Sequence, residues 1–211
     1  MILITGINGE MGNALVKKLH DSQSNNIIGL DIKSPREDVK PFLHKCYVGD
    51  IRDKDRLNRA ADEVDIIIHA AALKIVPTAE YNPFESVKTN IIGAMNLIDV
   101  AIEKRVKKII ALSTDKACDP INFYGATKLA SDKLFIAGNN YVGKKPTSFS
   151  VVRYGNVIGS RGSVIPFFLK LKKEKKQLTI TDKRMTRFFT TLDDAVKMVW
   201  TGLKNMKGGE I

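Results

Sequence analysis

Cysteine is scarce in this chain, with only Cys46 and Cys118 among 211 residues. Two thiols cannot build a disulfide framework, which excludes the class of small secreted domains held together by disulfides. The opening residues MILITGINGE lack the basic segment of a secretory signal. No apolar run approaches the ~20 residues that span a bilayer. We therefore expect a cytoplasmic protein with free thiols and no membrane span.

Histidine and acidic residues are also in short supply. His69 is one of three histidines and has no metal-ligating residue at a useful spacing, so we expect a packed side chain and no metal site. Lys and Arg number 34 against 23 Asp and Glu, a net charge of +11. Much of this excess lies at 103–108 and 169–176, where no aromatic residue is interleaved, so nucleic-acid binding is not expected. Solvated helix surface and attraction of an anionic substrate or acidic partner both remain open.

Short apolar runs alternate with segments of helical periodicity along the chain. Strands separated by helices in this rhythm predict a parallel, doubly wound α/β sheet, whose strands are apolar because both faces are buried. The predicted strands are 1–5, 26–32, 46–51, 64–72, 106–114 and 147–157, and the predicted helices are 9–20, 52–63, 83–105 and 123–139.

Three glycines follow the first predicted strand in the pattern G-x-x-G-x-x-G. Gly6, Gly9 and Gly12 permit a tight turn, and the helix that follows presents free N–H groups to a pyrophosphate. Such a loop at the first strand-to-helix junction of a doubly wound sheet predicts a dinucleotide site.

The ends of the next strands offer further contacts for a dinucleotide. Asp31 ends the second predicted strand, where a carboxylate can accept hydrogen bonds from the adenosine ribose of NAD. Lys33 and Arg36 lie close by and could instead hold the 2′-phosphate of NADP, so the preference for NAD is slight. Asp50 and Ile51 are predicted at the end of the third strand, beside an adenine. Small residues after the fourth strand leave room for the cofactor, namely Ala70, Ala71 and Ala72.

A tyrosine and a lysine four residues apart open the helix predicted after the fifth strand. Tyr124 and Lys128 share one helix face, and a nearby ammonium stabilises a phenolate, so Tyr124 can act as a base. Thr114 ends the preceding strand and can place its hydroxyl at the same substrate oxygen. Tyr141 and Lys145 repeat the spacing beside Gly143 and Pro146, so we expect a loop without a role there.

Six segments together carry a family resemblance: TGINGEMG, HAAALK, TNIIGA, STDKA, YGATK and RYGNVIGSRGSVIPFF. The chain resembles the extended short-chain dehydrogenase/reductase superfamily throughout, and within it most resembles the inverting UDP-N-acetylglucosamine 4,6-dehydratases. The resemblance implies a Rossmann-like domain at 1–162 and the beginning of a smaller sugar-nucleotide domain at 163–211. The family continues past the equivalent of Ile211, so the second domain is expected to be incomplete.

The resemblance also implies a reaction on UDP-N-acetylglucosamine with a recycled NAD or NADP. Tyr124, aided by Thr114 and Lys128, would serve oxidation at C4, while Lys116 would take the C5 proton and Asp115 would protonate the departing C6 hydroxyl. The family further implies a homo-oligomer. Additional contacts implied by the family are Met11 and Lys74 on the cofactor, and Lys74, Asn156, Val164 and Arg187 on the substrate.

Three departures from the family pattern bear on the cofactor. Ile75 stands where many members have histidine, and INGEM at 7–11 replaces a sequence closer to GTGSF. GLDIK at 29–33 is more similar to NAD-type epimerases. Two other functions remain open: a sugar-nucleotide 4-epimerase, which usually has small residues in place of Asp115 and Lys116, and a chain that binds a dinucleotide without turnover.

Overall fold

The computed structural model describes residues 1–22, 26–180 and 182–211. Its main sheet has the order β3-β2-β1-β4-β5-β6, and all neighbouring strands are parallel. The predicted doubly wound sheet is therefore confirmed. The strand bounds are β1 Ile2–Thr5, β2 Ile27–Asp31, β3 Lys45–Val48, β4 Ile66–His69, β5 Lys108–Thr114 and β6 Ser148–Tyr154.

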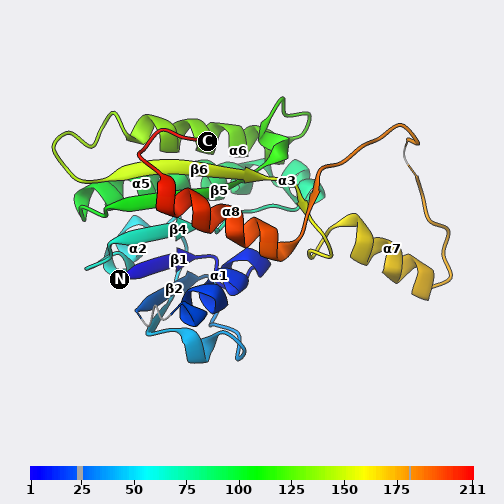
Figure 1. Ribbon diagram of the computed structural model, residues 1–211. Helices are drawn as coiled ribbons and strands as arrows, with labels where there is room; N and C mark the ends of the chain where they lie inside the picture. The colour runs from blue at the N-terminus through cyan, green and yellow to red at the C-terminus, as the bar shows by residue number, and fades with distance from the viewer. Residues whose placement is uncertain (23–25, 181) are drawn as a thin grey trace.

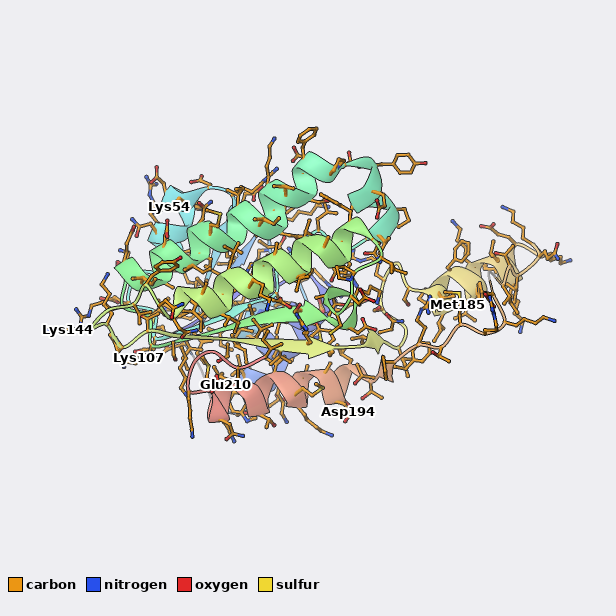
Figure 2. The ribbon with its side chains drawn as sticks, turned by 90° about the horizontal axis from the view of Figure 1, so that it is seen from above. Lys54, Lys107, Lys144, Met185, Asp194 and Glu210 are labelled. Carbon is orange, nitrogen blue, oxygen red and sulfur yellow. The ribbon has the colours of Figure 1, made fainter. Side chains whose placement is uncertain are left out.

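Helices cover both faces of this sheet, as Figures 1 and 2 show from two directions. On one face α1 (Glu10–Asp21) and α8 (Leu192–Asn205) pack around a core that includes Ile4 and Ile110. On the other face α2 (Lys54–Ala60), α5 (Gly93–Glu103) and α6 (Phe123–Gly138) enclose a second core. The apolar character of the strands follows from this burial on two sides.

The helix predicted over 83–105 is one helical stretch with a change of pitch. It starts as α4 (Pro83–Val87), widens into a π turn at Lys88–Ile92 and continues as α5. A further short helix that the sequence pattern did not reveal, α3 (Val76–Tyr81), precedes it. Two single 3₁₀ turns lie at Lys40–Phe42 and Asp115–Ala117.

The predicted third strand, 46–51, ends too late. β3 stops at Val48, and Asp50 and Ile51 lie in the loop that follows, where the Asp50 carboxylate accepts the backbone N–H of Arg52 at 2.9 Å. The short side-chain-to-backbone hydrogen bond offers the chain an alternative to the sheet ladder. Both residues still lie at the carboxyl edge of the sheet.

The C-terminal part of the chain differs from the prediction in three elements. The predicted strand 147–157 is interrupted after Tyr154, and its last two residues form β7 (Asn156–Val157). β7 pairs in parallel with β8 (Phe189–Thr190), which was not predicted, and α7 (Val164–Lys173), also not predicted, projects from the body in Figure 1 with no buried residue. The boundary at residue 162 stays a prediction. Beyond it in the sequence, α8 packs into the same core as α1.

None of the helices within the described residues combines the length and apolar character that a bilayer crossing requires.

We expect Phe149→Ala to lower the free energy of unfolding by about 3–5 kcal/mol, because it deletes a fully buried ring. The ring centroid of Phe149 lies 6.3 Å from that of Phe135 between β6 and α6. Phe167 on α7 is 52% exposed, so Phe167→Ala should change stability by no more than about 0.5 kcal/mol. Urea unfolding of the two variants checks this, and equal losses would contradict the assignment of the core.

Candidate active site at the carboxyl edge of the sheet

Two adjoining cavities lie along the carboxyl ends of the strands. One, of about 580 Å³, extends from the glycine loop to β5 and α6, and the other, of about 560 Å³, extends from the same loop to β2 and β3. Both are lined by Gly9, Ala70 and Ala72. Strand order reverses between β1 and β4, and doubly wound sheets bind ligands at this position.

The glycine loop is packed too tightly for side chains at two of its three glycines. A Cβ on Gly12 would lie 2.2 Å from the Gly6 carbonyl oxygen, and one on Gly6 would lie 2.7 Å from the backbone nitrogen of Ala71. Gly9 instead borders both cavities and caps α1, without any side-chain cap hydrogen bond in the described structure. The first N–H groups of α1 therefore have the geometry that a pyrophosphate requires.

Asp31 lines the second cavity from the end of β2. Its carboxylate accepts the backbone N–H groups of Asn8 at 2.9 Å and Lys33 at 3.2 Å. Arg36 points to Asp38 instead, with Nε 3.0 Å from Oδ1. The carboxylate is thus fixed at the cavity, while the guanidinium is engaged elsewhere.

Asn8 is a site residue that sequence reasoning missed. Its amide donates to the carbonyls of Lys33 and Ser34, and its Oδ1 accepts the N–H of Arg36. One side chain inside the glycine loop therefore fixes the loop after β2. No sequence spacing signals this role, since the partners lie some 25 residues away.

Asp50 and Ile51 both line the second cavity, from the loop after β3 and not from the strand itself, and their contact with an adenine stays a prediction. Arg52 spans its rim, with Nε 2.8 Å from Asp50 Oδ2 and Nη1 2.5 Å from Glu85 Oε2 on α4. An apolar side chain and an ion-pair bridge thus border this cavity.

The small residues Ala70 to Ala72 line the cavities directly after β4. His69 precedes them and is packed, as predicted: it is 1% exposed, and its ring lies 5.6 Å from that of Phe135. Its Nδ1 is 2.8 Å from Thr5 Oγ1, and burial lowers the pKa of His69 to about 3, so the imidazole is neutral. Its role is to join β4 to β1 below the cavity.

The π turn contributes Asn90, a second residue that the sequence did not reveal. Asn90 is 2% exposed and bonds both the N–H and the carbonyl of Leu73, at 2.9 and 3.0 Å. It also donates to Thr127 Oγ1, which in turn donates to the carbonyl of Tyr124. These hydrogen bonds therefore fix the loop after β4 relative to the start of α6. π turns occur often at functional sites.

α6 begins directly against the 3₁₀ turn at Asp115–Ala117. Asn122 caps the helix by accepting the Gly125 N–H at 2.8 Å. A Cβ on Gly125 would lie 2.2 Å from the carbonyl oxygen of Lys116. Only glycine permits this approach, which places Tyr124 and Lys116 on the walls of the same cavity.

Thr114, Lys116 and Asn156 line this cavity, and together with Asp115 beside it they form a connected network. Thr114 Oγ1 donates to Asp115 Oδ1 at 2.9 Å, and Lys116 Nζ lies 3.1 Å from the same oxygen. Lys116 Nζ also donates to Asn156 Oδ1 at 2.6 Å. The predicted acid and base are therefore in direct contact, each about one quarter exposed, with Asn156 from β7 as a third partner.

The titration of Tyr124 differs from the prediction. Burial raises the pKa of the phenol above its usual value, the Tyr154 phenol adds to this, and the Thr114 hydroxyl opposes it. Burial also lowers the pKa of Lys128, which is 2% exposed. In the chain alone, desolvation therefore outweighs the stabilisation that the Tyr-x-x-x-Lys spacing predicts. Tyr124 is a neutral phenol in this state.

Of the four remaining residues predicted to contact the cofactor or the substrate, two line a cavity and two do not. Met11 and Lys74 line the first cavity, and Lys74 Nζ lies 3.8 Å from Glu10 Oε2. Val164 begins α7, and Arg187 donates to the carbonyl of Thr186, both outside the two cavities. The second Tyr-x-x-x-Lys copy is a turn, as predicted, with Tyr141 72% exposed.

Two longer proteins are similar to this chain over its whole length. The chain is 54% identical over 220 residues to a UDP-N-acetylglucosamine 4,6-dehydratase (inverting) from Campylobacter jejuni, with 100% of this chain and 65% of that protein covered. It is 41% identical over 220 residues to a UDP-glucose 4-epimerase from Rickettsia massiliae, with 100% and 64% covered. The chain thus spans about two thirds, or slightly less, of these relatives.

Solved structures agree with the architecture. A dTDP-glucose 4,6-dehydratase from Streptomyces venezuelae, with NAD bound, superposes with a TM-score of 0.89 at 24% identity, covering 100% of this chain and 74% of that one. The extended short-chain dehydrogenase/reductase fold is therefore confirmed. A family model described as "Polysaccharide biosynthesis protein" matches residues 2–211. On this match and the relatives above, the chain belongs to the polysaccharide biosynthesis protein family.

Proposed function

We propose that this chain carries the catalytic part of a 4,6-dehydratase of UDP-N-acetylglucosamine that inverts C5. The observation that carries this proposal is the contact of Asp115 with Lys116, which lines the same cavity as Tyr124. Oxidation alone needs only Tyr124 and its helpers, whereas loss of water needs a further acid and base. The name of the Campylobacter jejuni relative supports the same activity.

Oxidation at C4 uses the wall formed by β5 and α6. Thr114 Oγ1 and Tyr124 Oη hold the C4 hydroxyl, and Tyr124, after releasing its own proton to solvent, accepts the hydroxyl proton as a phenolate. Lys128 supports the phenolate from one helical turn away. When bound, the oxidised nicotinamide would supply a positive charge, an acceptor for the hydride that leaves C4 and, in its reduced form, the donor of that hydride to C6. The residues fit such a group, since the glycine loop allows close approach of a pyrophosphate and the two adjoining cavities leave space for a dinucleotide on either side of the loop.

Elimination uses the Asp115–Lys116 pair. The C4 ketone acidifies the C5 hydrogen, Lys116 Nζ takes that proton, and Asp115 gives a proton to the C6 hydroxyl as it leaves as water. The pair must therefore begin as neutral amine and carboxylic acid. One proton crossing the 3.1 Å contact from Nζ to Oδ1 creates this state without changing the net charge. Elimination then returns the pair to its ionic form.

Inversion requires that C5 regain a proton on the face opposite to the one it lost. We propose that Lys116, held between Asp115 and Asn156 on one cavity wall, removes the C5 proton from its own face, and that the proton which C5 regains comes from solvent on the opposite face. Asn156, Lys74, Val164 and Arg187 are proposed substrate contacts. Homo-oligomer formation stays a prediction.

We propose NAD rather than NADP as the cofactor. Asp31 places a carboxylate at the second cavity, and two backbone N–H groups hold it there. A 2′-phosphate would bring a second anion against that carboxylate. Of the two cations that could compensate, Lys33 and Arg36, the latter is paired with Asp38.

Product analysis tests the function directly. UDP-N-acetylglucosamine is incubated with this chain, and with a chimera that adds the C-terminal remainder of the Campylobacter jejuni relative. A 6-deoxy-4-keto product, with loss of water by mass and an inverted C5 by proton NMR, is the expected result. An unchanged mass with an inverted C4 would identify an epimerase. No product from either protein, with nucleotide still bound, would indicate binding without turnover.

Tyr124→Phe and Lys116→Met should separate the two steps. Tyr124→Phe removes the base for C4, so no reduced nicotinamide should accumulate. Lys116→Met should still oxidise C4 but stall before loss of water, with dehydration slower by about 10²–10⁴-fold. Absorbance of reduced nicotinamide and deuterium uptake at C5 measure these outcomes. Dehydration by Lys116→Met at a near wild-type rate would mean that Asp115 and Lys116 form only a loop ion pair and take no part in elimination.

Asp31→Ala should weaken the preference for NAD over NADP by about tenfold, equivalent to ~1.4 kcal/mol. The carboxylate that opposes a 2′-phosphate is lost, while Lys33 and Arg36 remain. Asp62→Ala is the matched control, because it removes the same charge before β4, at the opposite edge of the sheet. Dissociation constants for the two nucleotides decide the question. Tighter binding of NADP by the wild-type chain would refute the role of Asp31.

A further inference from the structure

A buried carboxylate lies beside the site without a role in the chemistry above. Asp132 is 1% exposed, on α6 one turn after Lys128. Its Oδ2 accepts hydrogen bonds from Ser113 Oγ and from Arg153 Nε, each at 2.8 Å. Its Oδ1 is buried and has no hydrogen-bond partner among the described residues. An unpaired buried carboxylate oxygen calls for an explanation.

Fastening α6 to β6 is an insufficient reason for this charge. Asp132 and Arg153 do join the two elements, and Arg153 is 21% exposed. However, replacing a buried ion pair with apolar residues of similar volume is often neutral or stabilising. A charge kept here at the cost of desolvation therefore indicates a task that an apolar contact could not perform.

Lys128 is the neighbour that needs this charge. It is 2% exposed, and residues four apart on a helix share one face. Burial lowers the pKa of Lys128, and the Asp132 carboxylate raises it. His69 on β4 offers no counter-charge, because it is buried and neutral. The other titratable groups near this pair are Tyr124, Asp115, Lys116, Arg153, Tyr154 and Cys118, whose Sγ lies 3.1 Å from Arg153 Nη1.

We propose that Asp132 is a positioning residue that keeps the buried Lys128 in its ammonium form and thereby sustains Tyr124 as the base for C4. Ser113 and Arg153 fix the carboxylate through Oδ2 and leave Oδ1 without a counter-charge in the interior. This proposal rests on the proposed function for the step that Tyr124 performs. The charge relation between Asp132 and Lys128 can be measured without it.

The test is the alkaline titration of Lys128 in the chain without substrate or nucleotide. Lysine labelled with ¹³C at Cε gives an NMR resonance for each residue, and Lys128→Met identifies the one that belongs to Lys128. Asp132→Asn should lower the titration midpoint of Lys128 by about one pH unit or more, the effect of removing a nearby opposite charge. Ser113→Ala keeps the carboxylate and should leave the midpoint in place. An unchanged midpoint in Asp132→Asn would overturn the proposal.

A second variant keeps the test decisive if Asp132→Asn does not fold. Arg153→Gln retains the carboxylate and removes the cation that partly neutralises it. The Lys128 midpoint should then rise, opposite in sign to the effect of Asp132→Asn. An unchanged or lower midpoint in Arg153→Gln would mean that Asp132 serves only to fasten α6.

Kinetics separate this proposal from the proposed function. In Asp132→Asn the rate of C4 oxidation should fall more steeply as pH rises, because Lys128 loses its proton at a lower pH, while KM stays near the wild-type value. If the wild-type chimera does not dehydrate the sugar but the Lys128 midpoint shifts, the charge relation stands and the proposed function fails. A wild-type pH profile in Asp132→Asn would overturn the positioning role.

Discussion

The close approach of α6 to the end of β5 determines the geometry of this site. Gly125 lies where any Cβ would meet the Lys116 carbonyl at 2.2 Å, and Asn122 fixes the first turn of the helix at the same point. Tyr124 and Lys128 take their positions from this helix, while Thr114 and Lys116 take theirs from the strand and the turn. Every distance between the two groups therefore depends on one glycine contact.

Burial on both faces of the sheet restricts where polar chemistry can occur. The strands supply apolar walls, so functional side chains gather at the carboxyl edge, where the connecting loops begin. Charges that extend below this edge, such as Lys128 and Asp132, are desolvated and influence each other strongly. On a solvent-facing helix, water would screen the same two charges and their interaction would be weak.

The sequence predicted those parts of the structure that depend on local patterns. The six strands follow from apolar runs, and the glycine loop follows from its junction with a helix. The predicted end of the third strand was wrong, because the backbone after Val48 forms a hydrogen bond to the Asp50 side chain instead of continuing the hydrogen bonds of the sheet. α8 was not predicted, and only the fold shows that its apolar face completes the core beside α1.

Site residues were predictable where a motif carried them and hidden where the contact was long-range. Tyr124, Lys116 and Asp31 belong to spaced motifs. Asp132 on a helix would ordinarily be assigned to the solvent face, and only the fold brings it against Ser113 and Arg153. The pKa of Tyr124 could not be predicted either, because spacing carries no information about burial.

The π turn at Lys88–Ile92 fixes the number of residues that this part of the helix can contain. Asn90 contacts the loop after β4 and α6, while a Cβ on Gly93 would lie 2.7 Å from the Ile51 side chain of the other cavity. Each helical residue turns the next by about 100°, so removing one residue between them would direct one contact away from its partner. Over evolutionary time, insertions and deletions should be excluded from 88–93 but tolerated around Gly143, where a Cβ would meet nothing within 4 Å.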